Sequence, residues 1–174
     1  DPDTTLVTLL AAPRVAELPP AILARSDGIY LAAPEWENAM RIDDAGASDL
    51  SANGVFGSEE IMDANLWRQG LPRRLLVDSP LGVAEVASLG SRAGLTLHAS
   101  SGSDVKLALP AGTYVDAAAQ GDSLFVISAD RSTYRSTLMT VVFSGSSAEL
   151  AQIDTFTGVA TAIAADGARL YVAD

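Results

Sequence analysis

The chain of 174 residues contains no cysteine, one histidine and one lysine, Lys106. It also has no apolar run of the roughly 18 residues that a membrane-spanning helix needs. The absence of cysteine excludes disulfides, thiolate nucleophiles, iron–sulfur clusters and zinc–thiolate sites. Basic residues are few as well, with 11 against 22 acidic ones, which gives a formal net charge of -11. Such a chain is a poor partner for nucleic acids and anionic membrane surfaces, whose phosphates attract Lys and Arg.

What the sequence has in quantity is apolar residues, at 48% of the chain, which is too many for a disordered protein. The length fits one domain with a substantial core. We expect an N-terminal segment over residues 1–18 and one domain over residues 19–174, with a polar insertion at about 35–63. Residues 1–5 suit the polar stub that remains after a signal peptide is removed, so we expect a secreted or periplasmic bacterial protein.

One pattern recurs four times: a strand of small apolar residues, a turn with Gly or Asp, and a short strand rich in leucine, aromatic and β-branched residues. The pairs are 21–28 with 29–33, 83–90 with 95–99, 114–122 with 124–128, and 159–167 with 170–174. The dipeptides Asp27-Gly28, Gly121-Asp122 and Asp166-Gly167 tolerate positive φ, which assigns them to turns. The first strands are rich in alanine, at Ala117, Ala119, Ala160, Ala162 and Ala164, as we expect where strands crowd around an axis.

The spacing of these pairs indicates the architecture. The second strands begin at residues 29, 95, 124 and 170, so the intervals are 66, 29 and 46 residues with a mean of 47. A period of about 40–50 residues with four strands per unit is typical of β-propeller blades. The insertion accounts for the long interval, and the short one has room for one further strand, at 105–109. We therefore expect an all-β, propeller-like array of about three and a half blades of antiparallel strands, with a β-sandwich as the alternative.

Two stretches resemble known propellers. Residues 158–174 contain Gly-Val-Ala, Ala-Asp-Gly and Arg-Leu-Tyr-Val-Ala-Asp, and resemble the first two strands of blades in NHL, YVTN and gluconolactonase-like propellers. Residues 65–68 and 72–80 resemble the last two strands of blades in Tol-system and prolyl-oligopeptidase-type propellers. A closed propeller has about 4–8 blades. The resemblance therefore implies an incomplete propeller, whose open sheet edges are covered by missing blades, by another protein chain or by oligomerisation.

No catalytic constellation can be assembled from these residues. His98 lies on a predicted strand, on the face opposite Leu95 and Leu97. We expect a partly exposed, hydrogen-bonded histidine at this position and not a general base. No Gly-x-Ser-x-Gly elbow is present to select a serine nucleophile. The only fair helix signal, at residues 58–65, allows one or two turns. The sequence therefore predicts no catalytic residue.

The predicted binding residues are Glu35, Trp36 and Glu37, because an exposed tryptophan on a loop suits stacking against a ligand or partner. Trp67 is assigned to the core. Acidic residues gather in the insertion and after it, at Glu35, Glu37, Asp43, Asp44, Asp49, Glu59, Glu60 and Asp63. Calcium takes about 6–8 oxygen ligands. However, the spacing matches no calcium loop, so we predict a solvated acidic surface and no cofactor, with a divalent metal such as Ca²⁺ as the alternative.

Two classes of function follow. The first is an extracytoplasmic, non-catalytic binding or assembly module, which forms part of a larger protein or complex. The alternative is a fragment of a propeller enzyme, either a lactonase-type hydrolase or a quinone-dependent oxidoreductase. The first is preferred because no catalytic residues can be chosen, whereas the enzyme reading rests on the propeller resemblance alone.

Overall fold

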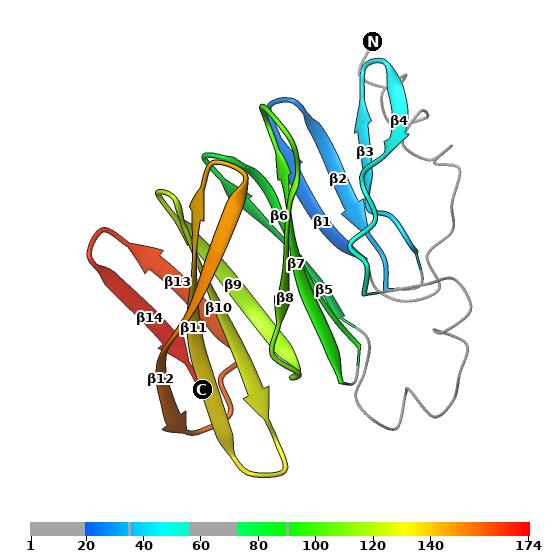
Figure 1. Cartoon of the computed structure of the whole chain (residues 1–174). Helices are drawn as coiled ribbons and strands as arrows, with labels where there is room; N and C mark the ends of the chain where they lie inside the picture. Colours follow the sequence, from blue (N-terminus) through cyan, green and yellow to red (C-terminus); the bar gives the residue numbers. More distant parts are fainter. Residues whose placement is uncertain (1–19, 35, 56–72, 90) are drawn as a thin grey trace.

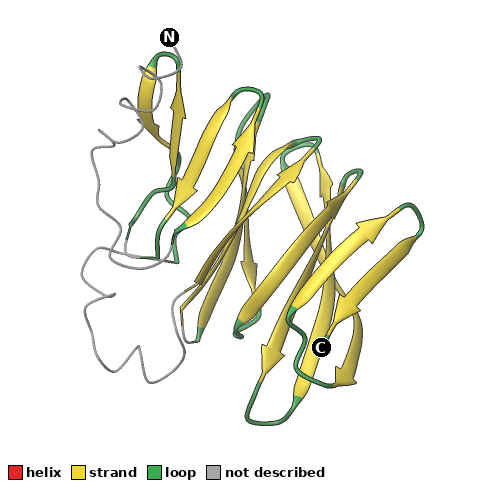
Figure 2. Cartoon of the chain, turned by 180° about the vertical axis from the view of Figure 1, so that it is seen from behind, coloured by secondary structure: helices red, strands yellow, loops and turns green. Residues whose placement is uncertain are grey.

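The computed structural model describes residues 20–34, 36–55, 73–89 and 91–174. These residues form strands and loops, with no helix, and thus no helix long and apolar enough to cross a membrane. The strands make three four-stranded sheets and one two-stranded sheet, all antiparallel (Figures 1 and 2). The predicted all-β fold is therefore confirmed for this part of the chain. The expected segment 1–18, the helix signal at 58–65, the strand at 65–68, and Glu35, Glu59, Glu60, Asp63 and Trp67 lie outside the described residues.

Each sheet takes its strands in chain order. The first sheet consists of β1 (Ala21–Arg25), β2 (Gly28–Ala32), β3 (Met40–Asp43) and β4 (Gly46–Asp49). The second consists of β5 (Arg73–Ser79), β6 (Gly82–Leu89), β7 (Arg92–Ala99) and β8 (Val105–Leu109). The third consists of β9 (Tyr114–Gln120), β10 (Ser123–Asp130), β11 (Arg135–Ser144) and β12 (Ser147–Thr157), and the fourth of β13 (Ala162–Asp166) and β14 (Arg169–Ala173).

The sheets follow one another across the molecule, as Figure 1 shows from blue to red. Their first strands are neighbours, because β1 contacts β5, β5 contacts β9, and β9 contacts β13. The second sheet lies between the first and the third, so that every residue of its strand β6 is buried, whereas β5 and β8 each keep exposed residues. The sequence of β6 is accordingly a nearly continuous apolar run, interrupted by Glu85.

The hydrophobic core lies between adjacent sheets. The largest cluster joins the second and third sheets and includes Val86, Leu95, Leu124 and Val141. A smaller cluster around Ile127, Leu138, Ala160 and Ile163 joins the third and fourth sheets. Because side chains alternate along a strand, β6 and β7 direct Ala84, Val86, Leu95 and Leu97 to the third sheet, whereas Glu85, Thr96 and His98 lie on the face toward the first.

The predicted turns are confirmed, and the first turns of two sheets depend on glycine. Gly121-Asp122 and Asp166-Gly167 lie between the first and second strands of a sheet, and Asp27-Gly28 ends such a turn, with Gly28 as the first residue of β2. Gly82 occupies the same place in the second sheet, with a φ of 147°. A Cβ atom at Gly82 would overlap the carbonyl oxygen of His98, so only glycine fits there.

The prediction for the second sheet is wrong by one strand. Residues 83–90 and 95–99 belong to the second and third strands of the sheet, β6 and β7. Residues 72–80, expected to close the preceding unit, supply β5, which pairs with β6 as the first strand. The second strands then begin at Gly28, Gly82, Ser123 and Arg169, with more even intervals of 54, 41 and 46 residues.

The polar stretch 35–63 is not wholly an insertion, because residues within it form β3 and β4 and complete the first sheet. These strands are short, and β4 is mostly exposed, so they carry little of the apolar alternation that identifies a strand. The alanines of the first strands also differ from one another. Ala117 and Ala160 are buried, as expected, whereas Ala162 and Ala164 are exposed because no described sheet covers that side of β13.

Candidate functional site

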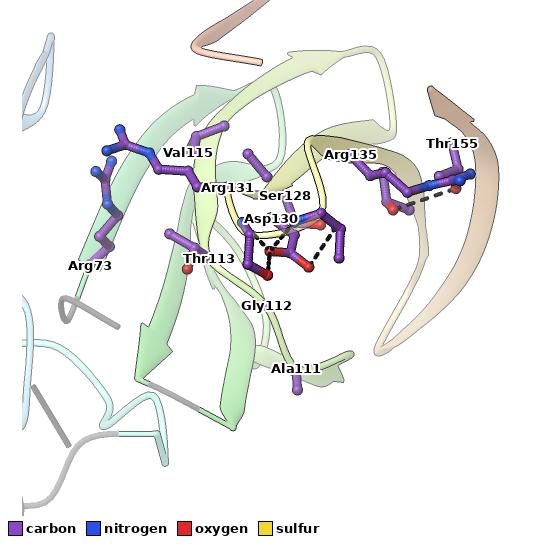
Figure 3. Close-up of a pocket in the computed structure, with 14 residues that line it drawn as sticks. Arg73, Ala111, Gly112, Thr113, Val115, Ser128, Asp130, Arg131, Arg135 and Thr155 are labelled. Carbon is purple, nitrogen blue, oxygen red and sulfur yellow. Dashed lines mark hydrogen bonds between the residues drawn. The ribbon is translucent and has the colours of Figure 1, made fainter. Parts of the chain in front are cut away.

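A groove of about 710 Å³ opens between the second and third sheets. It lies where β5 and β9 begin and where β10 turns into β11 (Figure 3). These strand ends meet because the first strand of every sheet starts at the end where the second strand finishes. Its polar lining includes Arg73, Arg131, Arg135, Asp130, Thr113 and Ser128.

The turn between β10 and β11 is organised by Asp130. One carboxylate oxygen accepts hydrogen bonds from the backbone N–H of Ser132 at 2.8 Å and from its hydroxyl at 2.6 Å. The other accepts one from the hydroxyl of Thr133 at 2.8 Å. The Ser132 and Thr133 hydroxyl bonds lower the pKa of Asp130 to about 2, so this carboxylate is ionised at neutral pH. Its hydrogen bonds thereby fix the turn that presents Arg131.

Three arginines line this groove in a chain that has only 11 basic residues. Arg73 is half-buried at the start of β5, and Arg131 and Arg135 are exposed at the ends of the turn. Within the described residues, no ion pair involves any of the three. In the view of Figure 3, the side chains of Arg73 and Arg131 extend to the same side and their guanidinium groups converge.

A second cluster of charged residues is buried between the first and second sheets. Its centre is Glu85 on β6, whose side chain is fully buried. The Glu85 carboxylate contacts Nη1 of Arg74 at 3.1 Å, Nδ2 of Asn53 at 2.9 Å and Nε2 of His98 at 3.0 Å. Arg74 also donates to the carbonyl oxygen of Trp36, in the loop between β2 and β3. The cluster therefore links the second sheet to two segments of the first: the loop between β2 and β3, which contains Trp36, and the segment after β4, which contains Asn53.

His98 extends this cluster to Asp104, whose carboxylate lies 3.3 Å from its Nδ1. Asp104 also accepts hydrogen bonds from the hydroxyl of Ser51 and, at 3.1 Å, from the backbone N–H of Ala99. Burial by itself would raise the pKa of Asp104, but the hydrogen bonds from Ser51, His98 and Ala99 outweigh it and lower the pKa from 3.8. Asp104 is thus the partly exposed end of an otherwise enclosed chain of polar contacts.

The enclosure of this cluster indicates a structural role. Histidine between two carboxylates is a familiar arrangement for proton transfer. Here, however, the side chains of His98 and Glu85 are 5% and 0% exposed, so a substrate has no route to them. The expectation of a partly exposed His98 is wrong, although the expected hydrogen bonding is present. Arg74 and Glu85 were not singled out from the sequence. The available signal was a lone carboxylate in an apolar strand, which requires a buried partner.

The predicted binding residues lie on the other side of this cluster. Trp36 is buried at 7% exposure and packs with Ala33, Met40 and Ile42, so its indole belongs to the core of the first sheet. Glu37 is exposed, and its carbonyl oxygen accepts a hydrogen bond from Arg74 at 3.2 Å. A binding role for Glu35, Trp36 and Glu37 stays a prediction.

Within the described ranges, no group of three His, Cys, Asp or Glu side chains is arranged to hold a metal ion. No protein-family model matches the chain, and no curated protein resembles it significantly. The function is therefore inferred from the geometry of the sheets, the groove and the exposed surfaces.

Proposed function

We propose that the chain is a propeller-type binding and assembly module without catalytic activity of its own, which forms part of a larger protein or complex. The observation that supports this is the contact of each first strand with the next, from β1 through β5 and β9 to β13. Successive four-stranded sheets whose first strands line one side are the arrangement of blades around an axis. A sandwich would instead place two sheets face to face, with strands that cross between them.

The fourth sheet differs from the other three, because the described residues give it two strands instead of four. The second strands of the complete sheets are well buried, and Leu124 and Val126 of β10 have no exposed surface. In β14, by contrast, Tyr171 is 50% exposed and Val172 is 37% exposed. The described residues provide no strand beside the outer edge of β14, whose backbone groups are thus available for pairing. We infer that two antiparallel strands of the same kind complete this sheet, as β11 and β12 complete the third.

The test is the association state of the purified chain, measured by light scattering over a range of salt concentrations. At low salt the net charge of -11 opposes association. Raising the salt from about 0.1 M to 1 M shortens the screening length from about 10 Å to 3 Å. We therefore expect dimers or larger species to appear at high salt, as β14 edges pair in the absence of the completing strands.

A matched pair of variants locates the contact. Val172→Lys places a charge beside the free edge and should reduce association. Val142→Lys alters a similarly exposed valine, at 44%, in β11, whose two edges are already paired with β10 and β12, and should leave association unchanged. A monomer at every salt concentration, or equal effects of both substitutions, would contradict the proposal. A secreted or periplasmic location remains part of the proposal, and fractionation of the producing cells tests it.

A further inference from the structure

We propose that the groove between the second and third sheets is a binding site for a small organic molecule that carries a carboxylate or phosphate group. This site is independent of the sheet edge on β14 and of any assembly through it. Three observations support the proposal: the groove is lined by three arginines against one carboxylate, its size suits a small molecule, and it lies between two packed sheets.

The arginines provide the first reason. The guanidinium groups of Arg73 and Arg131 converge in Figure 3, and the described residues supply neither with an ion-pair partner. Like charges that face one groove repel each other, and the repulsion is stronger for the half-buried Arg73 than it would be in bulk water. An oxyanion bound between them would remove this repulsion. Two planar guanidinium groups also present paired N–H donors, which match the geometry of carboxylate and phosphate oxygens.

The remaining lining fits such a ligand. Asp130 forms no ion pair with the arginines, because its oxygens accept hydrogen bonds from Ser132 and Thr133 within the turn. Its negative charge offsets only one of the three positive charges of the lining, which therefore stays positively charged. The hydroxyls of Thr113 and Ser128 are available to hydrogen-bond a polar ligand body. The volume of about 710 Å³ lies within the usual range of small-molecule sites, about 300–1,000 Å³. The rest of the chain is strongly acidic, which disfavours a long polyanion and favours a ligand that enters the groove alone.

The position of the groove supplies preorganisation. Arg73 begins β5, and the turn that carries Arg131 joins β10 to β11, so the two arginines belong to different sheets. Those sheets are held together by the largest hydrophobic cluster of the molecule. The backbone positions of the arginines are therefore fixed before the ligand arrives, so binding orders their side chains and little of the backbone.

The experiment is isothermal titration calorimetry of the purified chain with four probes: inorganic phosphate, glucose 6-phosphate, glucuronate and glucose. We expect at least one of the three anions to bind and glucose not to bind. Binding of the phosphates alone would assign the site to phosphate esters, and binding of glucuronate alone to carboxylates. Affinity should decrease as salt is raised, because the main contacts are ionic.

Variants link the binding to the groove. Arg131→Gln should weaken anion binding about tenfold or more, since it removes charge-assisted hydrogen bonds. Arg131 is exposed on a turn, so the midpoint of urea unfolding should match that of the parent. The control is Arg169→Gln, which removes an exposed arginine of β14 outside the groove and should leave affinity unchanged.

Three results would overturn the proposal. The first is that none of the anions binds at concentrations up to about 10 mM, a range that detects even weak millimolar affinity. The second is that Arg131→Gln binds them as tightly as the parent chain. The third is that glucose binds as well as glucose 6-phosphate, because the arginines would then contribute nothing to recognition.

Discussion

Replacement of Glu85 by alanine should be among the most destabilising substitutions in this chain. The Glu85 carboxylate is fully buried and contacts the side chains of Arg74, Asn53 and His98. Its removal leaves the Arg74 guanidinium, itself buried, with the carbonyl oxygens of the β2–β3 loop but without a compensating negative charge. Breaking a buried ion pair on one side costs about 3–5 kcal/mol. For a chain of this size that corresponds to about 2–4 °C of melting temperature for each kcal/mol.

Glu85→Gln separates the loss of charge from the loss of shape. The amide oxygen can still accept from Asn53 and Arg74, and the amide nitrogen can donate to Nε2 of His98 if His98 carries its proton on Nδ1. We therefore expect a smaller loss than for Glu85→Ala, and a folded variant that remains measurable. Glu149→Ala, which removes an exposed carboxylate from β12, is the control and should change stability by no more than about 0.5 kcal/mol.

Urea unfolding followed by far-ultraviolet circular dichroism measures these differences, provided that the slope against urea is the same for all variants. A double-mutant cycle with Arg74→Met provides the decisive comparison. If the two side chains form a buried ion pair, the double variant loses less than the sum of the single losses, because neither charge is left alone. Additive losses, or a Glu85→Ala variant as stable as the parent, would refute the account of this cluster.

Three further predictions test local features. Gly82→Ala should destabilise much more than Gly121→Ala, measured by urea unfolding, because both glycines have positive φ but only a Cβ at position 82 would overlap the carbonyl oxygen of His98. Thr96→Val should raise the unfolding free energy by about 1 kcal/mol, because the buried Thr96 hydroxyl has no hydrogen-bond partner among the described residues. The lowered pKa of Asp104 adds stability that is present above its unfolded pKa of about 3.9 and lost as the pH falls through the folded value. Asp104→Asn should therefore make the decrease in stability on acidification below about pH 5 shallower, as measured by urea unfolding at successive pH values.

The sequence predicted the strand content well where apolar alternation is strong. The strand expected at residues 105–109 matches β8, and the pair expected at 114–122 and 124–128 corresponds to β9 and β10. Prediction of strand order failed where a strand is buried on both faces, and prediction of the strands themselves failed where they are hardly buried. In the second sheet β6 is buried on both faces and lacks a polar face, and in the first sheet β4 is nearly all exposed. In both cases period-two alternation disappears, although the residues are in strands.

The sequence did not predict the candidate groove, for the same reason that it did not predict the order of strands in the second sheet. Arginine at a strand start or in a turn looks like a solvated charge, and Arg73 and Arg131 are far apart in the sequence. While residues 72–80 are assigned to the end of the first unit, Arg73 has no predicted relation to the third sheet. Once β5 becomes the first strand of the second sheet, its start lies beside the start of β9 and the end of β10. The position of Arg73 opposite the turn of Arg131 then follows from topology alone. In an antiparallel sheet the first strand begins at the same end at which the second strand finishes, so the start of β5 and the end of β10 lie on the same side of the molecule. Correct strand order within a unit is thus what brings these two positive charges into one groove, and composition alone carries no information about it.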